Sequence, residues 1–162
     1  MCAGLAGFTL VEILVVLVVL AIAAGALTAQ LERDPRRVAD GEARRLAGAL
    51  EHAAALAQWT GETLGVSVHG SGYRFWRRDS DSRWAAMSDS DVLAPRELPA
   101  GIVILPGTYA GATLAAEAVL PFRASGRNEP YTLVIQAQSW ALVLAADPLN
   151  RITLAGSATD AR

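Results

Sequence analysis

One acidic residue lies inside a long apolar run near the start of the 162-residue chain. Residues 8–31 read FTLVEILVVLVVLAIAAGALTAQL, and Glu12 is the only charged residue among them. A carboxylate in the middle of a bilayer costs about 2.5–3.5 kcal/mol on insertion scales, so an acidic residue in an apolar helix is by default a functional residue. Glu12 is therefore the first residue to which we assign a role. The alternative is a position at the membrane surface, where its carboxylate reaches water.

Other residue types that could do chemistry are few. His52 and His69 have no second metal ligand at a suitable spacing. The acidic segments 79–81 and 89–91 lack the glycine and the terminal glutamate of an EF-hand loop. No serine or cysteine stands beside a histidine and an acid in a pattern typical of a nucleophile, and the single cysteine excludes an internal disulfide. We expect no catalytic residue, no metal site and no cofactor.

Arginine and aromatic residues alternate in the segment 72–78, GYRFWRR, a composition typical of surfaces that bind nucleic-acid strands. In a strand, alternate side chains point to opposite faces. The two faces hold Tyr73, Phe75 and Arg77 on one side and Arg74, Trp76 and Arg78 on the other. A strand with one buried and one solvated face is the simpler interpretation, and the net charge of −2 argues against a generally basic nucleic-acid binder. We do not expect nucleic acid as a partner.

Three tryptophans lie on or near predicted strands. Trp76, Trp84 and Trp140 are expected to pack in the core, and any of them on the surface is a candidate anchor for a protein partner.

Residues 8–31 form the first element that must position these groups. A helix of this length is roughly 36 Å long, which exceeds the bilayer core of about 30 Å. We therefore predict a transmembrane helix over residues 8–31. A cleavable secretory signal with small residues at positions 21–26, or a plain signal anchor, is the alternative, but neither accounts for Glu12.

Residues 32–59 are predicted to continue the chain as an amphipathic helix that restarts at Pro35, its first helical position, with Asp34 as the N-cap. Apolar residues recur in it at spacings of three and four, as in an amphipathic helix. These residues are Val38, Ala43, Leu46, Ala47, Leu50, Ala53, Ala54 and Ala57.

The remaining residues, 60–162, alternate with the period of strands, and turn signals, including one at Pro106-Gly107, separate most of the runs. The expected strands are Thr63–His69, Gly72–Arg78, Gly101–Leu105, Ala118–Arg123, Tyr131–Gln138, Trp140–Ala146 and Arg151–Leu154. Because no helical pattern separates them, they should form an antiparallel sheet against which the amphipathic helix packs. The expected fold class is α+β.

The motif GFTLVE, Gly7 to Glu12, resembles the processing site of type IV pilins and of the pseudopilins of type II secretion. The resemblance implies that residues 1–7 are a leader, which a prepilin peptidase removes by cleavage between Gly7 and Phe8. It also implies that the same enzyme methylates the new amino group of Phe8. The carboxylate of Glu12 can then pair with this amine and set the axial register of subunits in a filament.

The order of several weaker motifs extends the resemblance to the whole chain, with the H-type minor pseudopilins (the GspH/FimT family) most similar. The motifs are Ala43-Arg44-Arg45-Leu46, Gly72-Tyr73-Arg74-Phe75-Trp76, Arg96-Glu97-Leu98-Pro99 and the segment 120–127. The resemblance implies a pilin-like fold and a single-pass inner-membrane protein with its N-terminus in the cytoplasm and its C-terminal domain in the periplasm.

The function that this resemblance implies is that of a minor pseudopilin in a short periplasmic pseudopilus, which helps export folded proteins across the outer membrane. The implied partners are the prepilin peptidase, the major and other minor pseudopilins, and the inner-membrane platform of the secretion system. The alternative is a FimT-like minor type IV pilin that binds DNA in natural transformation.

Overall fold

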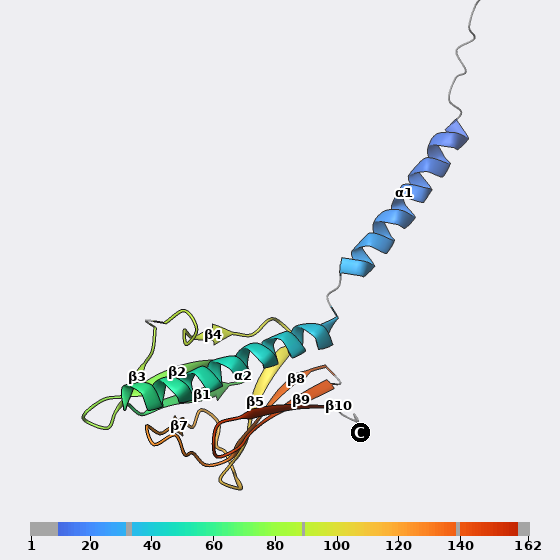
Figure 1. The fold of residues 1–162 in the computed structure, drawn as a ribbon. Helices are drawn as coiled ribbons and strands as arrows, with labels where there is room; N and C mark the ends of the chain where they lie inside the picture. The colour runs from blue at the N-terminus through green and yellow to red at the C-terminus, as the bar shows by residue number, and fades with distance from the viewer. Residues whose placement is uncertain (1–9, 32–33, 89, 139, 159–162) are drawn as a thin grey trace, which may run out of the picture. The chain divides into compact units, whose positions relative to one another are not determined.

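The computed structural model describes residues 10–31, 34–88, 90–138 and 140–158, and it divides into two compact units at Asp34. The first unit contains helix α1, Leu10–Leu31 (Figure 1). The large apolar side chains of this helix between residues 10 and 22 are all exposed. Within the described residues, no helix meets the combined length and hydropathy expected of a membrane-spanning segment.

The second unit begins with helix α2, Pro35–Thr60, which starts at the proline that the sequence predicted as its first residue. Short strands follow it along the chain (Figure 1). They are β1 Leu64–His69, β2 Gly72–Arg78, β3 Trp84–Ala86, β4 Arg96–Glu97, β5 Ile102–Tyr109, β6 Ala112–Thr113, β7 Leu120–Phe122, β8 Tyr131–Ala137, β9 Trp140–Ala146 and β10 Ile152–Ala158.

These strands form two antiparallel sheets, where the sequence had predicted one. The first sheet has the order β3-β2-β1-β7, with β4 also paired to β2. The second sheet has the order β10-β9-β8-β5-β6. Helix α2 contacts β1 and β7 of the first sheet and β8, β9 and β10 of the second, so that it covers both (Figure 1). The α+β class with a helix packed on antiparallel strands is thus confirmed.

Alanine dominates the buried face of α2, which allows the helix to lie close to the sheets. The buried residues are Ala39, Ala43, Leu46, Ala49, Leu50, Ala53, Ala54 and Ala57. Most of the predicted apolar stripe is therefore buried, although Val38 and Ala47 are only half-buried. The rest of the core comes from the strands, with Phe75, Phe122 and Leu133 among its fully buried side chains.

The predicted turn at Pro106-Gly107 is wrong, because both residues lie inside β5. The pairing of β5 with β8 shifts register between Pro106 and Tyr109. A bulge of this kind absorbs a proline, which cannot donate a ladder hydrogen bond. Gly107 permits the close approach of the two strands, since a Cβ there would lie 2.3 Å from Oγ1 of Thr132. The sequence also missed β3, β4 and β6, which are too short to show a period.

Candidate functional site

The predicted processing and assembly residues fall at the start of the chain. Glu12 lies in the first turn of α1 with an exposed side chain, a position where the helix dipole favours a negative charge. Gly7 and Phe8 lie outside the described residues, so cleavage between them and pairing of the Phe8 amine with Glu12 stay predictions.

Strand β2 separates its side chains as predicted. Tyr73 and Phe75 are buried, and their rings meet edge to face at 5.9 Å between centroids. Burial raises the pKa of the Tyr73 hydroxyl. Arg74 and Arg78 lie exposed on the opposite face. One face of the first sheet is therefore core and the other is solvated, which was the simpler of the two interpretations of this segment.

Two arginine–tryptophan pairs form on the solvated face of the first sheet. The guanidinium carbon of Arg74 lies 5.8 Å from the ring centroid of Trp76, and that of Arg78 lies 5.8 Å from the ring centroid of Trp84, a residue of β3. Trp84 also covers Gly65 of β1, where an added Cβ would lie 3.1 Å from the indole. Both tryptophans are half-buried on this face, so the expectation that they pack in the core is met only in part.

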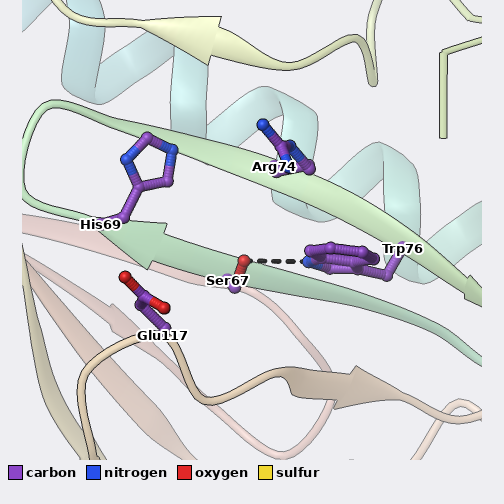
Figure 2. A pocket seen from close by; sticks show the side chains of 5 residues that line it. All are labelled: Ser67, His69, Arg74, Trp76 and Glu117. Atoms are coloured by element: carbon purple, nitrogen blue, oxygen red, sulfur yellow. Dashed lines mark hydrogen bonds between the residues drawn. The ribbon is translucent and has the colours of Figure 1, made fainter. Parts of the chain in front are cut away.

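A cavity of about 340 Å³ opens beside the first of these pairs (Figure 2). It is lined by Ser67, His69, Arg74, Trp76 and Glu117. The indole N–H of Trp76 donates to Oγ of Ser67 at 2.9 Å, which fixes the ring against β1. Arg74 and Glu117 bring opposite charges to the same cavity, so it does not concentrate the positive charge that a phosphate backbone requires.

A bidentate ion pair joins α2 to β4. Nε and Nη2 of Arg96 donate to Oε2 and Oε1 of Glu42 at 2.8 and 2.6 Å. The Arg96 guanidinium lowers the pKa of Glu42, against the opposing effect of burial. This contact fixes the short strand β4 to the helix.

The histidines and the acidic segments show no metal-binding arrangement among the described residues. His52 is exposed on α2, and His69 ends β1. Asp81 binds Nη2 of Arg83 at 2.6 Å, and Asp79 lies 3.5 Å from Nε of the same arginine. Asp89 lies outside the described residues.

Two further features were not predicted. Trp59, in the last turn of α2, is 90% exposed, and its position off the apolar stripe was the signal that could have indicated this. The face of the second sheet that points away from α2 carries apolar side chains, including the exposed Val103 and Leu105. The consecutive apolar residues at the centre of β8, Leu133 to Ile135, and along β9 were the signal for that face.

Two family descriptions match the chain in different regions. Residues 5–28 match the prokaryotic N-terminal methylation motif. Residues 42–150, which include most of α2 and the strands up to β9, match the family described as type II transport protein GspH.

Individual relatives agree with these matches. The type II secretion system protein H of Aeromonas hydrophila is 30% identical over 96 residues, which cover 57% of this chain and 52% of that protein. The chain therefore matches about half the length of this curated relative. Two structures of the minor pseudopilin EpsH from the type II secretion system of Vibrio cholerae are 19% identical with TM-scores of 0.56. They cover 75% and 78% of this chain and 98% and 97% of their own chains.

The structural likeness at this identity concerns the fold alone, whereas the family match extends over more than half of the chain. The chain belongs to the GspH family of type II transport proteins.

Proposed function

We propose that this chain is a minor pseudopilin of a type II secretion system, a subunit of a short periplasmic pseudopilus that helps export folded proteins across the outer membrane. The observation that carries the proposal is the order of two matches in one chain. The N-terminal methylation motif at residues 5–28 precedes the GspH match at residues 42–150. The proposed role of the protein is structural, and we assign it no catalytic residue.

The proposal assigns a processing role to the N-terminal segment. A prepilin peptidase removes residues 1–7 by cutting between Gly7 and Phe8 and methylates the Phe8 amine. The carboxylate of Glu12 then pairs with this amine in a neighbouring or the same subunit. Each charge alone is costly in an apolar environment, and their pairing offsets that cost. Glu12 thereby acts in filament assembly rather than in membrane insertion.

Residues 8–31 anchor the protein in the bacterial inner membrane, with the N-terminus in the cytoplasm and the domain built on α2 in the periplasm. This run contains only one charged residue, and such low charge in a long apolar segment supports an anchoring role. The partners are the major and other minor pseudopilins and the inner-membrane platform of the secretion system.

Substitution of Gly7 tests the processing step. We expect Gly7→Leu to leave the leader attached, whereas the matched variant Gly4→Leu, in the same leader, is processed normally. Intact-mass spectrometry of the purified protein reads both the loss of residues 1–7 and the methyl group on Phe8. Normal removal of the leader from Gly7→Leu contradicts the proposal.

Substitution of Glu12 tests the assembly role separately. We expect Glu12→Ala to reach the membrane fraction as the wild type does but to be depleted at least fivefold from pseudopilin complexes that are chemically cross-linked in the intact cell envelope and then purified. Glu12→Asp, which keeps the charge, serves as the control. Equal incorporation of all three proteins contradicts the assignment.

DNA binding by a FimT-like minor pilin is the second candidate, and the two exposed arginines stacked on Trp76 and Trp84 favour it. A DNA-binding protein should bind a labelled duplex with an affinity that falls as salt rises. Fluorescence anisotropy at low salt, with Arg74→Gln as the comparison, decides between the two functions. An absence of binding removes the second candidate.

A further inference from the structure

We propose that the face of the second sheet that points away from α2 is the surface by which this chain contacts a neighbouring pseudopilin. This inference rests on the proposed function and names the partner-binding surface that the function requires. The surface, called the outer face below, is formed by β5, β8, β9 and β10.

Alternation along the strands defines the outer face. Leu133 and Ile135 of β8 are fully buried, and Val134 between them points the opposite way. Strand pairing aligns Val134 with Leu105 of β5 on one side and with Val143 of β9 on the other. Val143 pairs in turn with Ala155 of β10. A row of apolar side chains therefore crosses four strands.

The neighbouring rows are also uncharged. One row begins at Val103, which pairs with a glutamine, and the other places Ala145 between two threonines. No described side chain on this part of the outer face carries a charge. Val103 and Leu105 at its β5 side are 39% and 41% exposed.

An antiparallel sheet with one solvated face normally alternates apolar and polar residues, as β2 of the first sheet does with Arg74 and Arg78. The outer face of the second sheet instead is uncharged and has an apolar central row, whereas α2 covers the opposite face. The largest apolar patch on a soluble protein is often functional, and we infer that this one contacts another protein. The partner must offer an uncharged surface, because a charge placed against these side chains loses its water without gaining a counter-charge.

The size of the outer face decides between partners. Four strands about 4.8 Å apart and five residues long, at about 3.4 Å per residue, give a footprint of roughly 300 Å². A stable pair of proteins in solution needs about 800 Å² on each partner. A second copy held by this face alone is therefore too weakly bound to be the partner. A neighbour already concentrated by its helix in the same filament needs much less area, because its binding is effectively intramolecular.

Site-specific photo-cross-linking tests the inference. The photoreactive amino acid p-benzoylphenylalanine is placed at Val134 of the full-length chain, expressed in its host with its secretion genes. Parallel probes are placed at His52, which is exposed on α2, and at Val15 of α1. We expect Val134 to give at least five times more adduct with another pseudopilin than His52 gives, with the adduct identified by mass spectrometry.

The other outcomes overturn the inference. Equal adducts at Val134 and His52, or adducts at Val134 only with a second copy or with α1 of the same chain, exclude the outer face as the contact for another pseudopilin. The Val15 probe separates this failure from that of the proposed function. Pseudopilin adducts at Val15 alone leave the proposed function intact, whereas their absence at both positions refutes the function and the surface together.

A charge on the outer face provides an independent measurement. Val143→Asp is expected to reduce the Val134 adduct at least fivefold while the melting temperature stays within a few degrees of the wild type. Val143→Thr, which is close in shape and uncharged, should keep the adduct. Wild-type cross-linking by a folded Val143→Asp protein overturns the inference.

Discussion

The ion pair between Glu42 and Arg96 should stabilise the domain more than an ordinary surface ion pair does. Its two charge-assisted hydrogen bonds are 2.8 and 2.6 Å long, and the side chains are only 12% and 32% exposed. Exposed ion pairs contribute about 0–1 kcal/mol, whereas a single hydrogen bond to a charged group contributes about 1.5–3 kcal/mol. Since Arg96 keeps some contact with water, we expect a coupling energy of about 2 kcal/mol, near the lower end of the second range.

A double-mutant cycle measures this coupling. The free energy of unfolding in urea is compared for the wild type, Glu42→Gln, Arg96→Gln and the double variant, in a fragment from Pro35 that contains all of the core residues. The Asp40–Arg44 pair on the same helix is the matched control, because its shortest contact, 2.8 Å, is close to the 2.6 Å of Glu42–Arg96 but its side chains are 40% and 70% exposed.

We expect a coupling energy below about 0.5 kcal/mol for the Asp40–Arg44 control pair, which is exposed and spaced by one helical turn. Equal coupling energies for the two pairs would refute the reasoning, since burial would then have no effect. A coupling energy below about 0.5 kcal/mol for Glu42–Arg96 would refute it as well.

The same pair gives a pH dependence with a defined sign. Arg96 lowers the pKa of Glu42 below its ordinary value of 4.5, so the folded protein releases this proton more readily than the unfolded chain. The stabilisation is therefore complete above pH 4.5 and is lost as the pH falls through the lower pKa of the folded state. The stability difference between the wild type and Glu42→Gln should shrink over that range. A difference that grows toward low pH contradicts the assignment.

Three further predictions concern stability measured by urea unfolding. Asn128→Ala should lower the free energy of unfolding by about 2 kcal/mol, because the buried Nδ2 of Asn128 donates to Oδ1 of Asn150 at 3.0 Å and joins two loops. An unchanged midpoint of urea unfolding contradicts this. Tyr131→Phe should be neutral or stabilising by up to about 1 kcal/mol, since the described residues offer its buried hydroxyl no hydrogen-bond partner. A clear loss of stability would contradict this, because it would show that the hydroxyl does form a hydrogen bond. Gly72→Ala should cost about 2 kcal/mol, because its Cβ would lie 2.3 Å from the carbonyl oxygen of Arg96; hydrogen exchange across β4 should rise, and unchanged exchange contradicts the contact.

Local patterns were sufficient to predict several elements of the fold. The start of α2 at Pro35 follows from the fixed φ of proline. The limits of β2 and β9 agree with the prediction, because both strands have a turn or a charged segment at their ends. The division into two sheets depends on pairs distant in the sequence, such as β1 with β7 and β5 with β8. No local period encodes which distant strand a segment will meet.

The site residues divide in the same way. Glu12 could be identified from the sequence because one charge in an apolar run is visible without any knowledge of the fold. The Glu42–Arg96 pair could not, because its partners are 54 positions apart and each is ordinary in its own segment. The stacking of Arg78 on Trp84 likewise requires β3, which has only three residues. Periodicity in the sequence therefore could not predict contacts between distant elements.

The outer face of the second sheet could be predicted from the sequence only in part. The runs TLVIQ in β8 and ALVLAA in β9 already contain it, because neither run has a charged residue and the outward positions include Val134 and Val143, where a solvated face usually carries polar side chains. Apolar residues on both sides at the centre of these strands favour two covered faces, and α2 contacts only one of them. We expect a neighbouring pseudopilin to cover the other. In the proposed pseudopilus, a neighbouring subunit packed on Val134 and Val143 would supply this second layer and one of the lateral contacts that a filament needs.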